Sequence, residues 1–434
     1  MNRVTAPMWE PQAETLPREQ LAQRSIEGMR RTLGRALTKA AWRRRLGAVT
    51  PDDIRGHDDW ARLPFLTKDE LRDAYPFGLA CVQPRRIVRV QMSSGTTGNP
   101  IINPYSRGDV EQWAAVMARC YLAAGVGRRD VVQITPSFGL FTGGFGFHYG
   151  AERIGAMVVP SGAGRTSLQL ALMRDLGATA LAAISTYPLR LIEVARAEGF
   201  DLRSLKLRVA ILGSEMWSDD LRSYIERELA LTAFDIIGMT ETGGPGMGIE
   251  CHLRDGIHVW DDHYLPEIVD PASGRVLPEG ESGELVVTTL TRQGLPLIRY
   301  RTRDITRVRS RERCGCGRTG VRLDRFRGRT DDMVIFKGVN FYPSQVEQIL
   351  LRQPGLDHEY QIVLERDAAR GDHLVLCVEA GSAFDRLAET RLLRELSDRL
   401  SLTPEIRRLG LGEIPRAAGK AVRVLDRRER TGAP

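Results

Sequence analysis

Between residues 131 and 238, short apolar runs alternate with longer amphipathic stretches. The apolar runs are VVQI, AMVVP, TALAAI, LRVAIL and AFDIIG, and helical patterns lie near 166–177, 188–199 and 218–230. Buried strands that are joined by helices predict a mostly parallel sheet with both faces covered. This alternation constrains the chain more than any other feature, and it predicts an α/β fold.

The segments before this region predict helices and one short strand. Residues 15–47 have apolar side chains at three- and four-residue spacing, which is typical of amphipathic helices. Thr67 and Glu70 have the spacing of a capping box. Residues 87–92 predict a strand and residues 109–124 predict a helix, so these elements lead into the alternating region.

The stretch from Val131 to Ala151 contains no Asp, Glu, Lys or Arg, which raises the question of a membrane span. It holds five glycines together with Gln133, Pro136 and His148, so it would make a poor spanning helix. We therefore expect a buried strand followed by a glycine-rich loop, and no association with a membrane.

After residue 250 the pattern changes to strands that are punctuated by Gly and Pro. Segments 258–270, 283–290 and 305–310 predict antiparallel strands. Residues 326–355 predict a turn, a hairpin and a capped helix.

The end of the chain predicts a small α+β unit that contains the strand HLVLCVEA, a helix at 386–400 and a final strand. We expect a domain boundary near Arg329–Asp332. It would divide the chain into a large domain of residues 1–330 and a small domain of residues 331–434.

The composition fits this organisation and excludes several classes of protein. The 434 residues suffice for two or three domains of roughly 150 residues each. A hydrophobic content of 42% excludes a disordered chain, and only six cysteines exclude a disulfide scaffold. The net charge is +7, but 55 acidic residues are interspersed with 62 basic ones, so no nucleic-acid-binding arm is indicated. The first thirty residues lack the apolar core of a signal peptide, and we expect a cytoplasmic protein.

A loop of glycines and hydroxyls, Ser93-Ser94-Gly95-Thr96-Thr97-Gly98, lies between a predicted strand and a predicted helix. Glycines let backbone N–H groups converge and hydroxyls add donors, which is how such loops hold phosphates. The Walker pattern G-x-x-x-x-G-K-[ST] does not occur in the sequence. The segment is therefore either a different phosphate-binding loop or a plain flexible turn.

A second motif, Asp235-Ile236-Ile237-Gly238-Met239-Thr240-Glu241, ends a buried strand with a glycine, a hydroxyl and a carboxylate. Ligands bind at the carboxyl ends of strands in open α/β sheets, so Glu241 would hold Mg²⁺ and Thr240 a phosphate. Alternatively, Thr240 is a helix N-cap that is followed by a first-turn acid.

Three further motifs follow along the chain. Tyr300-Arg301-Thr302-Arg303-Asp304 closes an antiparallel strand, and its carboxylate would either accept both hydroxyls of a ribose or belong to a surface charge cluster. Gly328-Arg329-Thr330-Asp331-Asp332 lies at the predicted domain boundary. Pro415-Arg416-Ala417-Ala418-Gly419-Lys420 places one of only five lysines on a short loop near the C-terminus.

In this order and spacing, the five motifs resemble those of the AMP-forming acyl-CoA ligases of the adenylate-forming superfamily. The chain is similar in particular to the phenylacetate–CoA ligases, with which it shares the stretches PFGLAC, FGLFTGGFGFHYGAERIGA, DDHYLPEIVDP, LTRQGLPLIRYRTRD and GVNFYPSQVEQIL. The resemblance runs from about residue 10 to residue 428. It implies an adenylation domain with parallel sheets and an antiparallel subdomain, followed by a small mobile domain.

The resemblance implies a homodimeric enzyme that uses ATP, Mg²⁺ and coenzyme A in two steps. The carboxylate of an aryl or arylacetic acid attacks the α-phosphate of ATP, which gives an acyl-adenylate and pyrophosphate. The small domain then rotates, and coenzyme A displaces AMP. An alternative within the superfamily passes the acyl group to a carrier protein or an amine.

The resemblance also implies roles for individual residues. Lys420 bridges the carboxylate and the α-phosphate during adenylation, Glu241 binds Mg²⁺, and Thr240 contacts phosphate. Asp331 is the hinge, and Gly338 lines the tunnel for the pantetheine arm of coenzyme A. The remaining nucleotide-binding residues are Ser93, Ser94, Gly95, Thr96, Thr97, Gly98, Gly213, Ser214, Glu215, Asp235, Ile236, Gly238, Asp304, Arg325 and Arg329.

An acyl pocket with aromatic and glycine walls, which suits a flat ring, also follows from the resemblance. One departure is Asn99, which stands where the phenylacetate enzymes have lysine after the phosphate loop, so a cation near the triphosphate is missing. The expected pocket residues are Ser137, Phe138, Phe141, Thr142, Gly143, Ile236, Ile237, Gly238 and Pro245.

The cysteines suggest a metal site. Cys314 and Cys316 form a tight C-x-C knuckle, and Cys251 and His258 lie in the preceding antiparallel region. Three thiolates and an imidazole would complete a tetrahedral zinc site, which would be structural because it leaves no open position. Alternatively, these are reduced thiols that simply lie near one another. The remaining cysteines, Cys81, Cys120 and Cys377, are expected in the core.

Two hypotheses outside the enzyme class are weaker. A non-catalytic nucleotide-binding relative would not need to retain Glu241, Asp304 and Lys420. A zinc-knuckle nucleic-acid binder would need a basic face, which the interspersed acids do not indicate.

Overall fold

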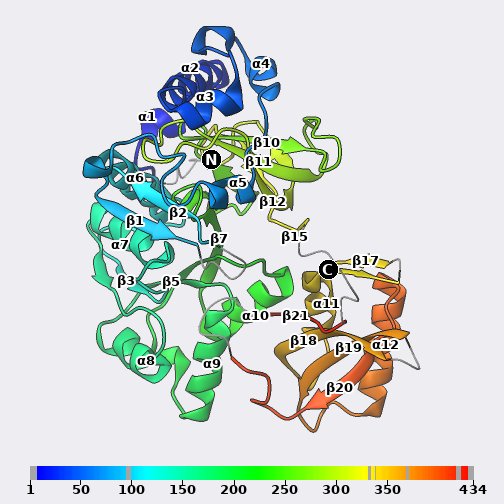
Figure 1. Ribbon diagram of the computed structural model, residues 1–434. Helices are drawn as coiled ribbons and strands as arrows, with labels where there is room; N and C mark the ends of the chain where they lie inside the picture. Colours follow the sequence, from blue (N-terminus) through cyan, green and yellow to red (C-terminus); the bar gives the residue numbers. More distant parts are fainter. Residues whose placement is uncertain are drawn as a thin grey trace.

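The computed structural model describes residues 7–93, 99–330, 334–337, 339–367, 371–416 and 422–428. A nine-stranded mixed sheet forms its centre, in the order β13-β14-β9-β8-β7-β6-β5-β3-β4 (Figure 1). Strands β4, β3, β5, β6 and β7 are neighbours in this sheet and run parallel, which confirms the predicted parallel sheet. The remaining strands extend the sheet beyond β7, beginning with the antiparallel pairs β7–β8 and β8–β9. The bounds are β3 Val131–Ile134, β4 Met157–Val159, β5 Ala180–Ile184, β6 Val209–Gly213, β7 Thr232–Met239, β8 Gly244–Glu250, β9 Ile257–Val259, β13 Val308–Ser310 and β14 Arg322–Leu323.

Helices cover both faces of this sheet because alternate strand residues point to opposite sides. In β5, Ala180 and Ala182 belong to a core that includes residues of α6 and α7, whereas Leu181 and Ala183 belong to a second core under α8, α9 and α10. Both cores are apolar, as the near-continuous apolar runs of the parallel strands predict. The helix bounds are α6 Arg107–Ala123, α7 Gly143–Arg153, α8 Thr166–Asp175, α9 Tyr187–Ala197 and α10 Asp219–Leu229, with a short 3₁₀ turn at Leu202–Ser204.

The glycine-rich stretch that follows β3 is partly helical, so the prediction of a loop as far as Ala151 was wrong. Its glycines make room for α6. A Cβ at Gly150 would lie 2.5 Å from the Cβ of Met117, and one at Gly146 would lie 2.7 Å from the Trp113 ring. Close packing of α6 against α7, rather than a turn, therefore requires these glycines.

The N-terminal region and a second, antiparallel sheet lie together above the central sheet in Figure 1. The helical segment expected at 15–47 divides into two helices near Leu37. The capping box is confirmed, since the Thr67 hydroxyl accepts a hydrogen bond from the Glu70 backbone at the start of α5. The bounds are α1 Pro11–Glu14, α2 Arg18–Ala36, α3 Ala40–Leu46, α4 His57–Ala61, α5 Lys68–Asp73, 3₁₀ turns at Pro51–Asp53 and Pro84–Arg86, the hairpin β1 Arg89–Met92 and β2 Ile102–Tyr105, and the sheet β10 Tyr264–Val269, β11 Gly283–Thr289, β12 Tyr300–Thr306 and β15 Gly328–Arg329.

The C-terminal part has its own sheet, in the order β20-β19-β18-β21, and its own apolar core. The long strand β18 was not predicted, because LDHEYQIVLERD carries many charged residues. Its apolar side chains nevertheless alternate between the main core, which contains Ile362 and Leu364, and a smaller cluster around Val363. The bounds are β16 Val334–Phe336, β17 Val339–Phe341, α11 Pro343–Leu350, β18 Leu356–Asp367, β19 Gly371–Ala380, α12 Arg386–Leu400, β20 Glu405–Leu409 and β21 Val424–Asp426. No helix within the described ranges is long and apolar enough to cross a membrane.

Candidate active site

The carboxyl ends of neighbouring parallel strands bring several expected nucleotide residues together. Gly213, the last residue of β6, pairs with Ile236 of β7, and a Cβ at Gly213 would lie 2.4 Å from the Ile236 carbonyl oxygen. Ser214 has a φ of 72°, in the left-handed region, so the chain turns sharply as it leaves the strand. The Glu215 carboxylate accepts a hydrogen bond from the Thr186 hydroxyl at 2.8 Å. These contacts build a tight corner at the strand ends.

Asp235 and Arg325, both expected at the nucleotide, are paired with each other. Arg325 Nε donates to Asp235 Oδ2 at 2.8 Å, and Arg325 Nη2 donates to the Trp217 carbonyl oxygen at 2.6 Å. The guanidinium carbon also lies 4.7 Å from the centre of the Trp217 ring. The Asp235 backbone N–H in turn donates to the Glu250 carboxylate at 2.8 Å. Arg325 is therefore held against Asp235 of β7 and Trp217 by several contacts.

Thr240 and Glu241 lie in the turn between β7 and the antiparallel strand β8, so the alternative of a helix N-cap is wrong. Both side chains are buried. The Tyr300 hydroxyl donates to Glu241 Oε1 at 3.2 Å. Burial, together with the nearby Glu241 charge, raises the pKa of Tyr300 well above its usual value, so the phenol keeps its proton and remains a donor. The carboxylate is thus held at a defined position.

Asp304 of β12 lies directly opposite Arg329 of β15 in the second sheet. Arg329 Nη1 is 3.3 Å from Asp304 Oδ1, so the two residues form an ion pair. Only 8% of Asp304 is exposed, which excludes a loose surface charge cluster. Two expected nucleotide residues from separate motifs are therefore side by side.

A large cavity of about 1870 Å³ lies between the central sheet region and the C-terminal part. Ser93, Ser137, Phe141, Ser214 and Glu215 are the expected site residues among those that line it. Among the described residues, its walls carry as many acids as arginines, and most of these arginines are in ion pairs. The arginines are Arg165, Arg190, Arg196, Arg227, Arg416 and Arg423, and the acids are Glu193, Glu198, Glu215, Glu228, Asp357 and Glu359.

Other expected pocket residues do not line this cavity in the described ranges. Phe138 packs edge-on against Phe145, with ring centres 5.5 Å apart. Pro245 accepts a hydrogen bond from the Trp113 indole at 2.9 Å. The others are Thr142, Gly143, Ile236, Ile237 and Gly238, of which Thr142, Gly143, Ile236 and Ile237 are buried.

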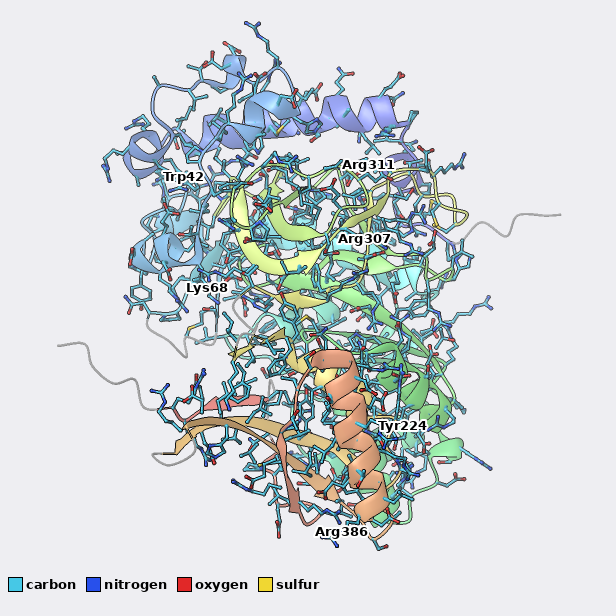
Figure 2. All side chains as sticks on the ribbon, turned by 90° about the vertical axis from the view of Figure 1, so that its right-hand side faces the viewer. Trp42, Lys68, Tyr224, Arg307, Arg311 and Arg386 are labelled. Atoms are coloured by element: carbon cyan, nitrogen blue, oxygen red, sulfur yellow. The ribbon has the colours of Figure 1, made fainter. Side chains whose placement is uncertain are left out.

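The two parts also touch directly across the cavity. The rings of Tyr224 in α10 and His358 in β18 lie 4.5 Å apart (Figure 2 labels Tyr224). Arg352 Nε is 2.8 Å from Asp220 Oδ2.

Several expected site residues lie outside the described residues. They are Ser94, Gly95, Thr96, Thr97 and Gly98 of the glycine–hydroxyl loop, the hinge residue Asp331, the tunnel residue Gly338, and Lys420.

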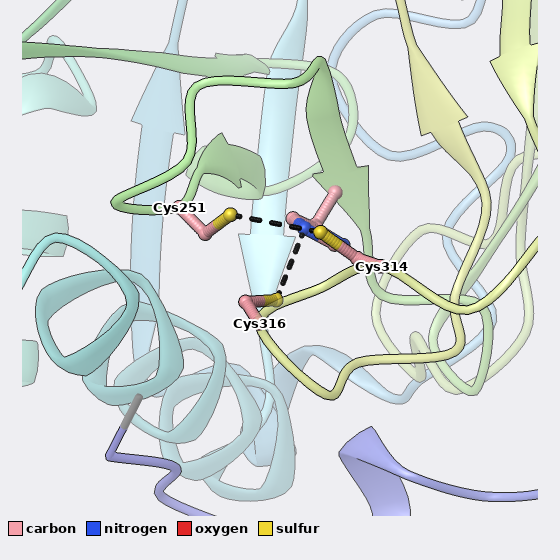
Figure 3. A group of neighbouring side chains, drawn as sticks. Cys251, Cys314 and Cys316 are labelled. Atoms are coloured by element: carbon pink, nitrogen blue, oxygen red, sulfur yellow. Dashed lines mark hydrogen bonds between the residues drawn. The ribbon is translucent and has the colours of Figure 1, made fainter. Parts of the chain in front are cut away.

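The expected metal ligands form a compact buried cluster (Figure 3). The ligand atoms of Cys251, His258, Cys314 and Cys316 all lie within 4.8 Å of one another. Cys251 Sγ is 3.9 Å from Cys314 Sγ, and Cys316 Sγ is 3.6 Å from His258 Nε2. Burial lowers the pKa of His258, so the ring is neutral, which is the form that binds metals. Of the other cysteines, Cys120 and Cys377 are buried as expected, and Cys81 is partly exposed.

Sequence reasoning missed two buried polar residues behind the Thr240–Glu241 turn, Asn103 and Arg292. Asn103 donates hydrogen bonds to the carbonyl oxygens of Thr240 and Glu241, and Arg292 donates to Asn103. The one available signal was an asparagine inside the otherwise apolar strand segment around residues 101–105.

Comparisons with known proteins agree along most of the chain. Residues 36–291 match the family described as AMP-binding enzyme, and residues 338–428 match the AMP-binding enzyme C-terminal domain. The phenylacetate-coenzyme A ligase of Thermus thermophilus is 40% identical over 97% of this chain and 100% of its own length. The phenylacetate-coenzyme A ligase of Escherichia coli is 41% identical over 90% of this chain and 91% of its own length.

Solved structures of one ligase resemble this chain to different degrees. 2-Hydroxyisobutyryl-CoA ligase in the postadenylation state with 2-HIB-AMP matches with a TM-score of 0.90 at 27% identity, over 98% of this chain and 94% of that one. The same ligase in the thioesterification state, with 2-HIB-AMP and CoA, gives 0.73 at 28% identity, over 99% and 95%. Since identity and coverage are nearly equal, the overall arrangement of this chain is closer to that of the postadenylation state.

Proposed function

Because the chain belongs to the family of AMP-binding enzymes and, within it, to the phenylacetate–CoA ligases, we propose that its acid substrate is phenylacetate or a close aryl analogue. The enzyme is an AMP-forming acid–CoA ligase that makes an acyl-adenylate and then a CoA thioester. The observation that supports phenylacetate as the acid substrate is the similarity to a phenylacetate-coenzyme A ligase along 97% of the chain. Phe141 and Ser137 in the wall of the cavity support it, since they offer an aromatic surface and a hydroxyl.

In the first step, a carboxylate oxygen of the acid bonds to the α-phosphorus of ATP and pyrophosphate leaves. In the second, the sulfur of CoA bonds to the acyl carbon, the thiol proton is lost, and AMP leaves with the electrons of the acyl–oxygen bond. Both steps depend on alignment and on neutralisation of negative charge. We assign charge neutralisation to Lys420, ribose binding to Asp304 with Arg329 beside it, and the adenine side to Ser214, Glu215 and Asp235.

The Thr240–Glu241 turn is our candidate for the magnesium site. A carboxylate and a hydroxyl are oxygen ligands of the kind that Mg²⁺ prefers, and the remainder of its octahedral shell is usually filled by water and phosphate. Bound there, Mg²⁺ would neutralise charge on the phosphates of ATP. The hydrogen bond from Tyr300 would keep the Glu241 carboxylate aimed.

We also propose two mobile units, residues 1–330 and 331–434, with Asp331 as the hinge. The higher similarity to the postadenylation state than to the thioesterification state supports two arrangements of such units. Lys420→Ala should then lower acyl-adenylate formation by about 10²–10³, yet leave thioester formation from preformed acyl-adenylate nearly intact. Gly338→Leu should do the reverse by blocking the pantetheine tunnel. Single-turnover measurement of each half-reaction tests this, and equal losses in both for Lys420→Ala would exclude it.

The Cys/His cluster is proposed to hold a structural zinc ion. Tetrahedral zinc with bonds of about 2.3 Å to sulfur and 2.0–2.1 Å to nitrogen places ligand atoms roughly 3.6–3.8 Å apart. Two of the distances within the cluster, 3.9 Å and 3.6 Å, are close to that geometry, and all four ligand atoms lie within 4.8 Å of one another. Arg318, which pairs with Glu14 at 2.7 Å, also points Nη1 at Cys316 Sγ from 3.7 Å and would offset thiolate charge. Elemental analysis of protein purified without chelator should find about one zinc per chain.

The decisive test of the substrate is a pyrophosphate-release screen over arylacetic, aryl and aliphatic acids, with and without CoA. Phenylacetate or a close analogue should give the highest kcat/KM, with sustained turnover only when CoA is present. Faster turnover of a fatty acid than of every aromatic acid would overturn the proposal. Turnover supported by a carrier protein or an amine, but not by CoA, would favour the alternative acceptor.

Two further parts of the proposal concern assembly and location. A homodimer would show in light scattering as about twice the chain mass of 48.4 kDa. A cytoplasmic location fits the supply of ATP and CoA, and cell fractionation tests it.

A further inference from the structure

Asn103 of β2, which lies outside the sequence motifs, reaches the backbone of the Thr240–Glu241 turn. Asn103 is fully buried. Its Nδ2 donates hydrogen bonds to the carbonyl oxygen of Thr240 and, at 3.3 Å, to that of Glu241. The residues are 137 positions apart in sequence, so only the fold creates this contact. One amide group thereby holds two successive peptide groups of the turn.

Arg292 fixes the direction in which the Asn103 amide points. Arg292 Nη2 donates to Asn103 Oδ1 at 2.7 Å. A guanidinium has only donors, so the side of the amide that faces it must be the oxygen. The amide nitrogen therefore has to face the two carbonyl oxygens of the turn.

Arg292 is itself rigidly held. It is 2% exposed, its guanidinium carbon lies 4.3 Å from the centre of the Tyr105 ring, and Nη1 is 3.8 Å from Asp109 Oδ1. Asp109 also accepts hydrogen bonds from the backbone N–H groups of the two residues after Arg292, at 2.7 Å and 2.9 Å. A Cβ at Gly243 in the turn would lie 3.2 Å from Arg292 Nη1. The turn therefore rests on this guanidinium as well as on Asn103.

We propose that Asn103, oriented by Arg292, is a positioning residue that sets the affinity of the Thr240–Glu241 turn for magnesium and the ATP phosphates. The inference rests on the proposed roles of Glu241 and Thr240. Asn103 holds the backbone that bears both groups, while Tyr300 holds the carboxylate itself. Residues that orient metal ligands from behind typically change metal affinity or activity 10- to 100-fold.

Asn103→Asp is the sharpest test, because it keeps the size of the side chain and its pairing with Arg292. It replaces the donor that faces the two carbonyl oxygens by an acceptor, which should push the turn away. The concentration of Mg²⁺ that half-saturates adenylation should rise about 10-fold or more, and kcat should recover largely at high Mg²⁺. Thioester formation from preformed acyl-adenylate should stay within twofold of the wild type.

Two variants keep the test independent of folding. Arg292→Lys preserves the charge but loses the planar fork that orients the amide, so it should raise the Mg²⁺ requirement in the same direction by a smaller factor. Thr32→Val removes a buried hydrogen bond, from Thr32 Oγ1 to the Thr289 carbonyl oxygen at 2.9 Å. It should lower the melting temperature without changing the Mg²⁺ requirement. Arg292→Lys replaces Asn103→Asp as the test if the latter does not fold.

The outcomes distinguish the role of Asn103 from the proposed magnesium site at Glu241. An unchanged Mg²⁺ requirement in Asn103→Asp or its replacement, or equal loss in both half-reactions, would reduce Asn103 to a structural residue and overturn the inference. Glu241→Gln is measured in parallel. If it raises the Mg²⁺ requirement while the Asn103 variant does not, only the role of Asn103 is wrong. If Glu241→Gln also leaves the requirement unchanged, the proposed magnesium site fails, and the role of Asn103 fails with it.

Discussion

The two ends of strand β8 carry polar clusters of different chemistry. The turn before Gly244 holds Thr240 and Glu241, whose side chains offer oxygen atoms. Directly after Glu250, Cys251 joins a cluster of sulfur and nitrogen ligands. Mg²⁺ prefers oxygen ligands, whereas zinc in structural sites takes sulfur and imidazole nitrogen. Seven residues of strand thus separate a candidate site for a reaction from a candidate site for stability.

Burial does not distinguish the two ends, because both clusters are shielded from solvent. The number of ligand atoms that each cluster offers does distinguish them. Three thiolates and one imidazole would complete the tetrahedral shell of zinc, so no position would be left for a substrate. One carboxylate and one hydroxyl fill only part of the octahedral shell of magnesium and leave room for phosphate and water. Substitutions at one end should therefore change stability, and substitutions at the other should change rate.

Cys316→Ser is expected to have the largest effect. Loss of one of four ligands should release the zinc and lower the free energy of unfolding by about 4 kcal/mol or more, because binding energy at a structural zinc is folding energy. Adenylation by the fraction that remains folded should persist. Chemical denaturation, with zinc content and specific activity measured on the same samples, checks both parts.

Cys120→Ser provides the matched control, since Cys120 is a buried cysteine outside the cluster. It should retain the zinc and lose less stability. Equal zinc loss in the two variants, or zinc absent from the wild type, would contradict the proposal that the cluster after Glu250 is a structural zinc site.

Glu241→Gln tests the other end. The amide keeps the shape and can still accept from Tyr300, but it lacks the negative charge that would bind Mg²⁺. Adenylation should fall by about 10²–10³, which corresponds to roughly 3–4 kcal/mol of transition-state stabilisation. The melting temperature should change little. Pyrophosphate release under single-turnover conditions and thermal unfolding give the two readouts.

Glu267→Gln is a suitable comparison for that variant. Glu267 is also shielded from solvent and pairs with Arg299 at 3.0 Å, and neither residue is an expected site residue. It should alter stability while leaving the Mg²⁺ dependence of adenylation as it is. If Glu241→Gln and Glu267→Gln both lowered stability without lowering adenylation, the proposed role of the Thr240–Glu241 turn in the reaction would be wrong.

The sequence predicted well those features that depend on local pattern. The helix expected at 166–177 is α8 at Thr166–Asp175, and the four metal-ligand candidates were named from residue type and spacing before the fold brought them together. The capping box at Thr67 follows from two residues three positions apart.

Features that depend on distant packing were not predictable in this way. The glycines of α7 predicted a loop, but they are present because α6 packs too closely against α7 for larger side chains. The periodicity of the sequence gives no information about that packing. Asn103 could not be assigned a role, since its partners lie 137 or more residues away and are mostly backbone atoms. Tyr300 was part of a motif, but its hydrogen bond to Glu241 depends on the approach of two sheets.

A third buried acid, Glu347 of α11, sharpens the comparison because it is not an expected site residue and its titration should affect stability. Burial raises the pKa of Glu347 to about 7 from an ordinary value of 4.5, with Arg423 opposing the shift and Glu215 and Glu359 adding to it. Between these two pH values the folded protein therefore holds a proton that the unfolded chain has released. Stability from this group is present below pH 4.5 and is lost as the pH rises to about 7.

Glu347→Gln removes that titration, so its effect should depend on pH. Above pH 7 the variant should be more stable than the wild type by about 1–3 kcal/mol, because no buried charge has to form. Near pH 4.5 the two proteins should differ little, since both then carry a neutral side chain. Urea unfolding at pH 5 and pH 8.5 measures the difference, and Glu405→Gln at an exposed position should show no such dependence. A gain in stability that is the same at both pH values would mean that the substitution acts through packing and not by removing the charge of a buried carboxylate. Glu347 would then not be an example of a buried acid whose charge affects stability.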